Sequence, residues 1–277
     1  MSVNLLASNT AKVDFGDIAD LGTSLTTISV ALTFKPTAAT VSNRRLFGQW
    51  GNTSPSWLVY VPDTDEMEFL ITNGIGNFFG RKTSTLNLAS GTTYRAVCTY
   101  DSSGGGSMHI YVNGTDFSLT ADGSSNVALA DSVRTVAAGR ETDSSTNGAD
   151  GDYSELAIWD RVLSLEEAVA YGQGYSPEFF RFRGLHYWRL LDTSSLTDSW
   201  GSANGTNSGG TDATHPTVIM PGGAVLNNLS EFGLKVESVA GNIRVTQAFV
   251  DFLVSDPAGT VPSLVLFDHH YKQQGMR

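Results

Sequence analysis

The residues that could do chemistry are acidic, and the first group of them precedes a predicted strand. Asp63, Asp65 and Glu68 approach the Glu-x-Asp-x-x-Glu spacing that sets two carboxyls on one strand face, as a glycoside hydrolase requires. The first acid is Asp rather than Glu, and the residues between the acids are polar where a strand over a core would be apolar. We therefore interpret the stretch as an acidic turn entering a strand over residues 66–72, and we predict no catalytic residues.

A second acidic stretch, residues 143–152, is rich in oxygen atoms that could bind calcium. It does not match an EF-hand loop, because Ser145 occupies an acid position and Glu155 falls one residue late. A polar loop without metal is the alternative interpretation. The candidate calcium ligands are Asp143, Asn147, Asp150 and Asp152.

Five aromatic side chains fall in or beside predicted loops, and the run Asn-Phe-Phe-Gly-Arg at residues 77–81 is the most suggestive. Aromatic rings at a rim can stack on the faces of sugars. The alternative is that the rings pack over the ends of the fold or into a subunit contact. The candidate carbohydrate-binding residues are Trp50, Trp57, Phe78, Phe79 and Trp200.

Composition excludes several classes of function. The 277 residues include 29 glycines and only 16% charged side chains, a profile typical of strands and turns. A formal net charge of −11 disfavours nucleic acid and anionic membranes as partners. No apolar run reaches the roughly 18 residues of a membrane span, and the N-terminus lacks the pattern of a signal peptide. We expect a protein that folds in a cytoplasm without membrane insertion.

Other reactive groups lack the arrangement that catalysis or cofactor binding needs. The five histidines show no metal-ligand spacing, and there is neither a Gly-x-Ser-x-Gly elbow nor a phosphate-binding Gly-rich loop followed by Lys. Cys98 is the single cysteine, so no internal disulfide forms, and its strand-like surroundings predict a buried thiol. No cofactor is expected apart from the candidate calcium ion.

Short strand candidates recur between turn signals, which indicates an all-β sandwich. Asn113-Gly114 is the strongest hairpin signal. Residues 151–159 alternate, which predicts Tyr153, Glu155, Ala157 and Trp159 on one face of a strand and Leu156 and Ile158 on the other.

A single short helix is predicted directly after this strand. Ser164 and Glu167 have the spacing of a capping box, which predicts a helix from Leu165 to about Tyr171.

Six segments in order resemble laminin G-like (concanavalin A-like) sandwich domains, over roughly residues 10–175. They are residues 13–16 (VDFG), 28–36 (ISVALTFKP), 94–101 (YRAVCTYD), 110–114 (IYVNG), 136–140 (VAAGR) and 151–167. The resemblance implies a jelly-roll β-sandwich. It also implies a domain with a binding or structural role, which often holds a calcium ion at its rim. Such a domain is an enzyme only where a specific acidic motif is present.

Residues 186–206 and 214–218 resemble a segment that follows this sandwich in phage virion proteins. The likeness implies an extra strand and a rim loop that return to the sandwich at about residues 185–218. A first domain is therefore predicted over residues 1–222.

After residues 221–223 (PGG) the sequence pattern changes to β-prone runs. A β-rich anchoring or oligomerisation extension is predicted over residues 223–277. Residues 234–239 and 243–254 are strand candidates, and the second resembles a strand at the ends of phage structural proteins. So short a segment makes no core of its own. The extension should therefore need a partner, which is either the sandwich of the same chain or another subunit. The candidate assembly residues are Ile243, Val245, Phe249, Phe252 and Val254.

The sequence therefore predicts a non-enzymatic structural protein of a phage virion, as a capsid decoration or a tail or fibre component. Its expected partners are other virion proteins and further copies of itself, and its expected location is the virion, assembled in the host cytoplasm. The alternative is a carbohydrate-binding adhesin whose partners are cell-surface or environmental glycans. A glycoside hydrolase is the third hypothesis.

Overall fold

The computed structural model is a β-sandwich followed by a separate second unit. It describes residues 2–6, 10–21, 25–37, 44–51, 55–62, 66–73, 77–84, 86–124, 126–140, 147–221, 235–239 and 242–247. The first compact unit is Met1–Ile219 and the second is Met220–Arg277. No helix among the described residues is long and apolar enough to cross a membrane.

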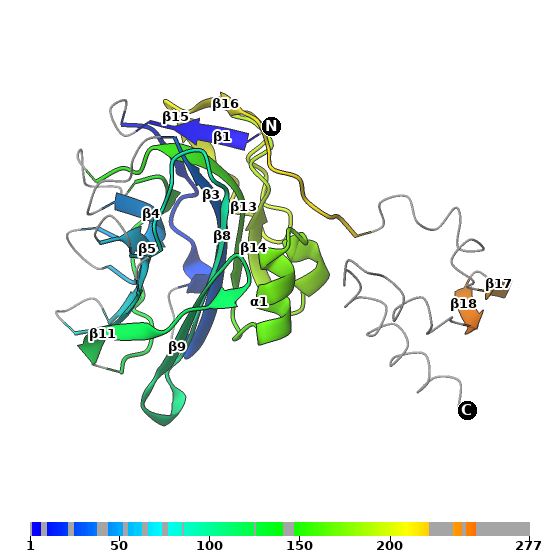
Figure 1. Ribbon diagram of the computed structural model, residues 1–277, viewed down its shortest axis with the longest axis horizontal. Helices are drawn as coiled ribbons and strands as arrows, with labels where there is room; N and C mark the ends of the chain where they lie inside the picture. Colours follow the sequence, from blue (N-terminus) through cyan, green and yellow to red (C-terminus); the bar gives the residue numbers. More distant parts are fainter. Residues whose placement is uncertain are drawn as a thin grey trace. The chain divides into compact units, whose positions relative to one another are not determined.

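Two antiparallel sheets form the sandwich, which confirms the predicted fold class (Figure 1). Sheet A runs in the order β10 (Thr115–Asp116), β9 (Ser107–Val112), β8 (Tyr94–Asp101), β3 (Thr27–Pro36), β13 (Gly151–Trp159), β1 (Ser2–Leu5) and β16 (Thr211–Ala213), with β14 (Gly184–Trp188) also paired to β13. Sheet B runs in the order β11 (Leu119–Ser124), β7 (Phe78–Thr83), β6 (Glu68–Thr72), β5 (Trp57–Val61), β4 (Arg44–Gln49), β12 (Val136–Ala138), β2 (Lys12–Asp14) and β15 (Thr206–Ser208). Two 3-10 turns, η2 (Ala19–Leu21) and η3 (Ser103–Gly105), lie in the connections.

The core lies between the sheets because alternate residues of each strand face inward. On β3 the inward residues are Ile28, Val30, Leu32 and Phe34, all at most 1% exposed. Cys98 on β8 is buried in the same core, as predicted.

The predicted hairpin turn at Asn113-Gly114 is confirmed. Both residues have positive φ, 50° and 78°, which is the backbone of a type I′ turn. The end of α1 (Leu165–Gly172) packs on this turn so closely that a Cβ at Gly172 would lie 2.0 Å from the Gly114 nitrogen. Glycine at 172 therefore brings the helix against the hairpin.

Strand β13 departs from the predicted alternation. A register shift lies between Ser154 and Ala157, and Glu155 in between has a φ of 52°. This β-bulge turns Tyr153 into the main core together with Leu156, while Trp159 faces the opposite side. The prediction that Tyr153 and Trp159 share a face is wrong, because it assumed an unbroken period of two.

Helix α1 covers the outer face of sheet A, on the side away from sheet B (Figure 1). Its predicted capping box is confirmed, since the side chains of Ser164 and Glu167 each accept from the other residue's backbone N–H. Tyr171 on the helix packs with Trp159 and Ala157 in a second apolar cluster. The sandwich thus has a partial third layer.

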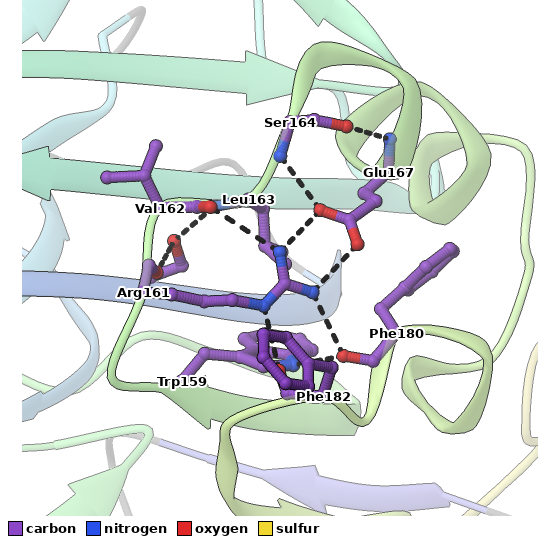
Figure 2. Close-up of polar contacts among 9 residues, drawn as sticks. Trp159, Arg161, Val162, Leu163, Ser164, Glu167, Phe180 and Phe182 are labelled. Atoms are coloured by element: carbon purple, nitrogen blue, oxygen red, sulfur yellow. Dashed lines mark hydrogen bonds and ion pairs between the residues drawn. The ribbon is translucent and has the colours of Figure 1, made fainter.

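Arg161 holds this third layer to the strand end (Figure 2). Its guanidinium donates to both carboxylate oxygens of Glu167, at 2.6 and 2.7 Å, and to the carbonyls of Phe180 and Phe182. The carbonyls belong to the turn that contains η4 (Pro177–Phe180). Such bidentate, charge-assisted bonds fix the turn relative to α1.

The predicted returning segment completes both sheets. After β14 pairs with β13, β15 joins sheet B beside β2 and β16 joins sheet A beside β1 (Figure 1). Trp188, Leu190 and Leu196 from this segment are buried in the main core.

The second unit contains one described hairpin, β17 (Lys235–Val239) with β18 (Asn242–Gln247). Its two strands pair with each other, and no third strand joins them among the described residues. Ile243 and Val245 lie on β18, whereas Phe249, Phe252 and Val254 lie outside the described residues.

We expect a chain of residues 1–221 to unfold cooperatively and a chain of residues 1–183 to lack a cooperative transition. The shorter chain loses Trp188, Leu190 and Leu196, whose burial contributes about 5–9 kcal/mol, comparable with the entire stability of a typical domain. Thermal unfolding followed by near-ultraviolet circular dichroism measures this. A cooperative transition in the 1–183 chain would contradict a completing role for the segment.

Candidate functional site

The predicted aromatic platform does not form, because two of its members are core residues. Trp57 is 0% exposed and Phe79 is 2% exposed. Trp57 meets Phe47 edge-on at 5.0 Å, and Phe79 packs on Tyr100 at 5.3 Å. Both rings lie at inward positions of β5 and β7, so the prediction that they bind sugar is wrong.

The remaining three aromatic candidates are partly exposed but lie on different parts of the fold. Trp50 follows β4 and Phe78 begins β7, both in sheet B. Trp200 lies on the outer side of sheet A, where its ring contacts Trp159 at 5.4 Å and Tyr187 at 5.2 Å. Trp50 and Phe78 therefore remain candidates, whereas Trp200 serves the outer apolar cluster.

The predicted calcium ligands are only partly described, and Asp143 lies outside the described residues. Asp152 is already engaged, because its Oδ1 accepts from the Asn4 amide at 2.6 Å and its Oδ2 lies 3.6 Å from the Lys35 ammonium. A lysine at that distance disfavours a cation there. No group of three or more His, Cys, Asp or Glu suited to a metal occurs within the described ranges. Calcium binding through Asp143, Asn147 and Asp150 stays a prediction.

A charged cluster lies across the outer face of sheet B. Its central residue is Glu68, one of the three acids that precede or begin the predicted strand. The cross-strand register sets Tyr60 on β5, Glu68 on β6 and Lys82 on β7 side by side. Glu68 is 1% exposed, and the Tyr60 hydroxyl donates to its Oε2 at 2.7 Å. Lys82 pairs with Glu66 at 3.0 Å, and the Arg45 guanidinium lies over the Tyr60 ring.

The Glu68 carboxyl has an unusual proton affinity. Burial is the largest cause, and together with the nearby carboxyl of Asp122 it outweighs the lowering by the Tyr60 hydrogen bond and by Lys82, so that the pKa rises from 4.5 to about 7. Burial and the Glu68 carboxyl likewise raise the pKa of Tyr60. Glu68 therefore changes charge near neutral pH.

A second buried carboxyl, Glu155, was missed as a functional residue by the sequence analysis. It is 2% exposed at the β13 bulge, and its Oε2 accepts from the Tyr187 hydroxyl at 2.5 Å. His215 Nε2 lies 3.1 Å from its Oε1, and Arg189 Nε lies 3.5 Å away. These partners are 32 to 60 positions later in the chain, so no local spacing could have indicated them.

Asp198 organises the rim loop of the returning segment. Its carboxylate accepts from the backbone N–H groups of Tyr187, Trp200, Gly201 and Ala203. It also lies 2.6 Å from His186 Nδ1. Burial alone would raise its pKa, but the bonds from His186 and the backbone outweigh burial and lower the pKa to about 2. Because its carboxylate accepts from four backbone N–H groups, Asp198 stabilises the conformation of the loop, and we assign it no catalytic role.

Comparison with known proteins decides the family. The model of the concanavalin A-like lectin/glucanases superfamily matches residues 7–169. The chain belongs to this superfamily. The match ends within α1, so the returning segment that completes both sheets lies beyond it.

Solved structures of other proteins are similar to this chain. A protein from Bacteroides ovatus that is proposed to bind carbohydrate aligns with a TM-score of 0.60 at 16% identity, over 79% of this chain and 61% of that one. Domain 4 of an extracellular arabinanase from Geobacillus stearothermophilus, solved with arabinotriose, aligns with a TM-score of 0.42 at 19% identity, over 58% of this chain and 70% of that one. This chain thus spans about three fifths of the length of the first. No curated protein matches it.

The superfamily name covers lectins and glucanases, so the carboxyl geometry matters. The two carboxyls of a glycosidase stand about 5 Å apart or more, to leave room for the sugar carbon or for water. Glu68 is instead 1% exposed, and its Oε2 accepts from the Tyr60 hydroxyl. The other acids weighed for this role, Asp63 and Asp65, lie outside the described residues. Glu68 is thus enclosed by its neighbours on the strand face and is not open to a sugar, and the sandwich is lectin-like.

Replacing Glu68 by Gln should flatten the dependence of stability on pH. Because the folded-state pKa is above the unfolded value, stability from protonated Glu68 is complete below about pH 4.5 and declines as pH rises through about 7. Glu68→Gln mimics the protonated form, so its melting temperature should fall less between pH 5 and pH 8 than that of the wild type. Glu66→Gln, a half-exposed neighbour, is the matched control and should keep the wild-type slope. Equal slopes for Glu68→Gln and wild type would refute the assignment.

Proposed function

We propose that the protein is a non-enzymatic structural component of a phage particle, in which the sandwich is displayed and residues 220–277 attach it to its neighbours. The observation that carries the proposal is the division of the chain. The sandwich is complete by Ile219. The only described elements after it are the two strands β17 and β18. A two-stranded hairpin is marginally stable by itself in water, so it needs further pairing.

The edges of the sandwich support display rather than polymerisation. Its terminal strands β10, β15 and β16 are two or three residues long and polar. The longer edge strand β11 carries a register shift between Ala121 and Gly123. Short, polar and bulged edges resist strand addition. Attachment through the second unit is therefore favoured over attachment through the sheets.

The assignment to a phage particle depends on the resemblance of residues 186–218 and 243–254 to segments of phage structural proteins. Within the particle, a capsid decoration and a tail or fibre component are both consistent with a displayed sandwich. Strand addition of β17 or β18 to a neighbouring subunit is the proposed mode of attachment.

Carbohydrate binding is the second candidate function, and two partly exposed rings favour it. Trp50 and Phe78 remain at the surface of sheet B, where each could stack on a sugar. We expect Trp50→Ala or Phe78→Ala to weaken binding to a glycan found on an array, with an unchanged melting temperature. Equal binding by both variants and the wild type would remove this rim as the site.

The attachment role predicts a difference in solution mass. We expect the full chain to form a defined oligomer and the chain of residues 1–221 to be a folded monomer, because only the full chain contains β17 and β18. Multi-angle light scattering after gel filtration measures both masses. Two monomers with the same melting temperature would contradict self-assembly through the second unit, and an oligomeric 1–221 chain would place the contact on the sandwich.

A further inference from the structure

A polar hollow of about 220 Å³ lies on the outer face of sheet A, beside α1. Its floor is formed by two cross-strand pairs, Thr33 with Ser154 and Lys35 with Asp152, from β3 and β13. The Thr33 hydroxyl also contacts the Tyr171 hydroxyl of α1 at 3.0 Å, which places the hollow next to the helix. The volume exceeds that of a few waters and falls below the 300–1,000 Å³ of typical drug-sized pockets.

The wall opposite the floor belongs to the returning segment, and His215 places it against Glu155 of β13. His215 lines the hollow, and its Nε2 lies 3.1 Å from Glu155 Oε1 and 3.2 Å from the Arg189 carbonyl. Its Nδ1 lies 2.8 Å from the Pro216 carbonyl. Both ring nitrogens therefore lie close to oxygen atoms, Nδ1 to the Pro216 carbonyl and Nε2 to Glu155 and the Arg189 carbonyl.

Several polar groups of the hollow are available to a ligand. The hydroxyls of Thr93 and Thr214 make no side-chain hydrogen bond within the part of the chain that the structure describes, whereas Ser154 is 1% exposed and belongs to the floor. The Lys35 ammonium is 3.6 Å from Asp152 Oδ2, too far for a hydrogen bond, and its side chain is 39% exposed. Both groups of this pair therefore keep hydrogen-bonding capacity.

The charges of the hollow balance, which favours a neutral ligand. Lys35 is offset by Asp152, and Glu155 is offset by Arg189, whose Nε lies 3.5 Å from Glu155 Oε1. A site for an anion would carry unpaired cations, and a site for a metal would lack a lysine at the floor. A loosely spaced ammonium and carboxylate match two neighbouring hydroxyls, one accepting from Lys35 and one donating to Asp152.

A second, shallower hollow of about 380 Å³ adjoins the first and shares Thr214 and His215 with it. It lies along residues 212–215 of the returning segment. A ligand longer than one ring could therefore continue from the first hollow into the second.

We infer that the hollow between β3, β13 and the returning segment binds one ring of a neutral saccharide, with adjacent hydroxyls bridging Lys35 and Asp152 and the next ring over residues 212–215. The site is on the opposite sheet from Trp50 and Phe78, the rim candidates. It does not depend on the proposed attachment role, which the mass measurement tests separately.

The experiment is saturation-transfer difference NMR on the full chain with a panel of neutral mono- and oligosaccharides, followed by titration of each sugar that responds. Lys35→Met and Thr93→Val should each weaken binding at least about tenfold, the effect of losing one good hydrogen bond. Lys82→Met is the matched control, since Lys82 is a half-exposed lysine paired with an acid on sheet B. It should bind as the wild type does, and all variants should keep the wild-type melting temperature.

Four results would overturn the inference. The first is that no sugar of the panel binds, and the second is that Lys35→Met and Thr93→Val both bind like the wild type. The third is that Trp50→Ala or Phe78→Ala abolishes binding while Lys35→Met does not, which assigns the sugar to the rim. The fourth is that sodium sulfate displaces the sugar at equal concentration, which shows that the site recognises negative charge.

Discussion

The architecture depends on the buried carboxyl of Glu155 at the β13 bulge. A buried charge is costly unless it is paired and hydrogen-bonded. Here the required partners are Tyr187, Arg189 and His215, which all come from the returning segment. The segment packs against β13 and places these partners around the carboxyl.

At the same bulge, strand β13 changes its pairing partner along one edge from β1 to β14. The first half of β13 pairs with β1, and the second half pairs with β14. The positive φ at Glu155 costs conformational energy, and the surrounding contacts maintain it. The family match ends at residue 169, yet Trp188 lies in the main core against Phe15 at 4.2 Å. The folded unit is thus larger than the matched region.

Sheet A and sheet B present different chemistry on their outer faces. Sheet A carries an apolar cluster under α1 and, beside it, a polar hollow with balanced charges. Sheet B carries Glu68, whose raised pKa results from burial among neighbours on the strand face. A lectin-like fold therefore offers two chemically distinct surfaces.

The sequence by itself determined the all-β class, the Asn113-Gly114 hairpin and the capping box at Ser164, because these depend on residues a few positions apart. It also indicated that a segment near residues 185–218 returns to the sandwich. Tertiary structure alone decided that Trp57 and Phe79 face inward, because the face of a strand residue depends on register and on the opposite sheet. It also decided the roles of Glu155 and Glu68, since their pairing and pKa depend on burial and on partners brought together only by the folded sheets.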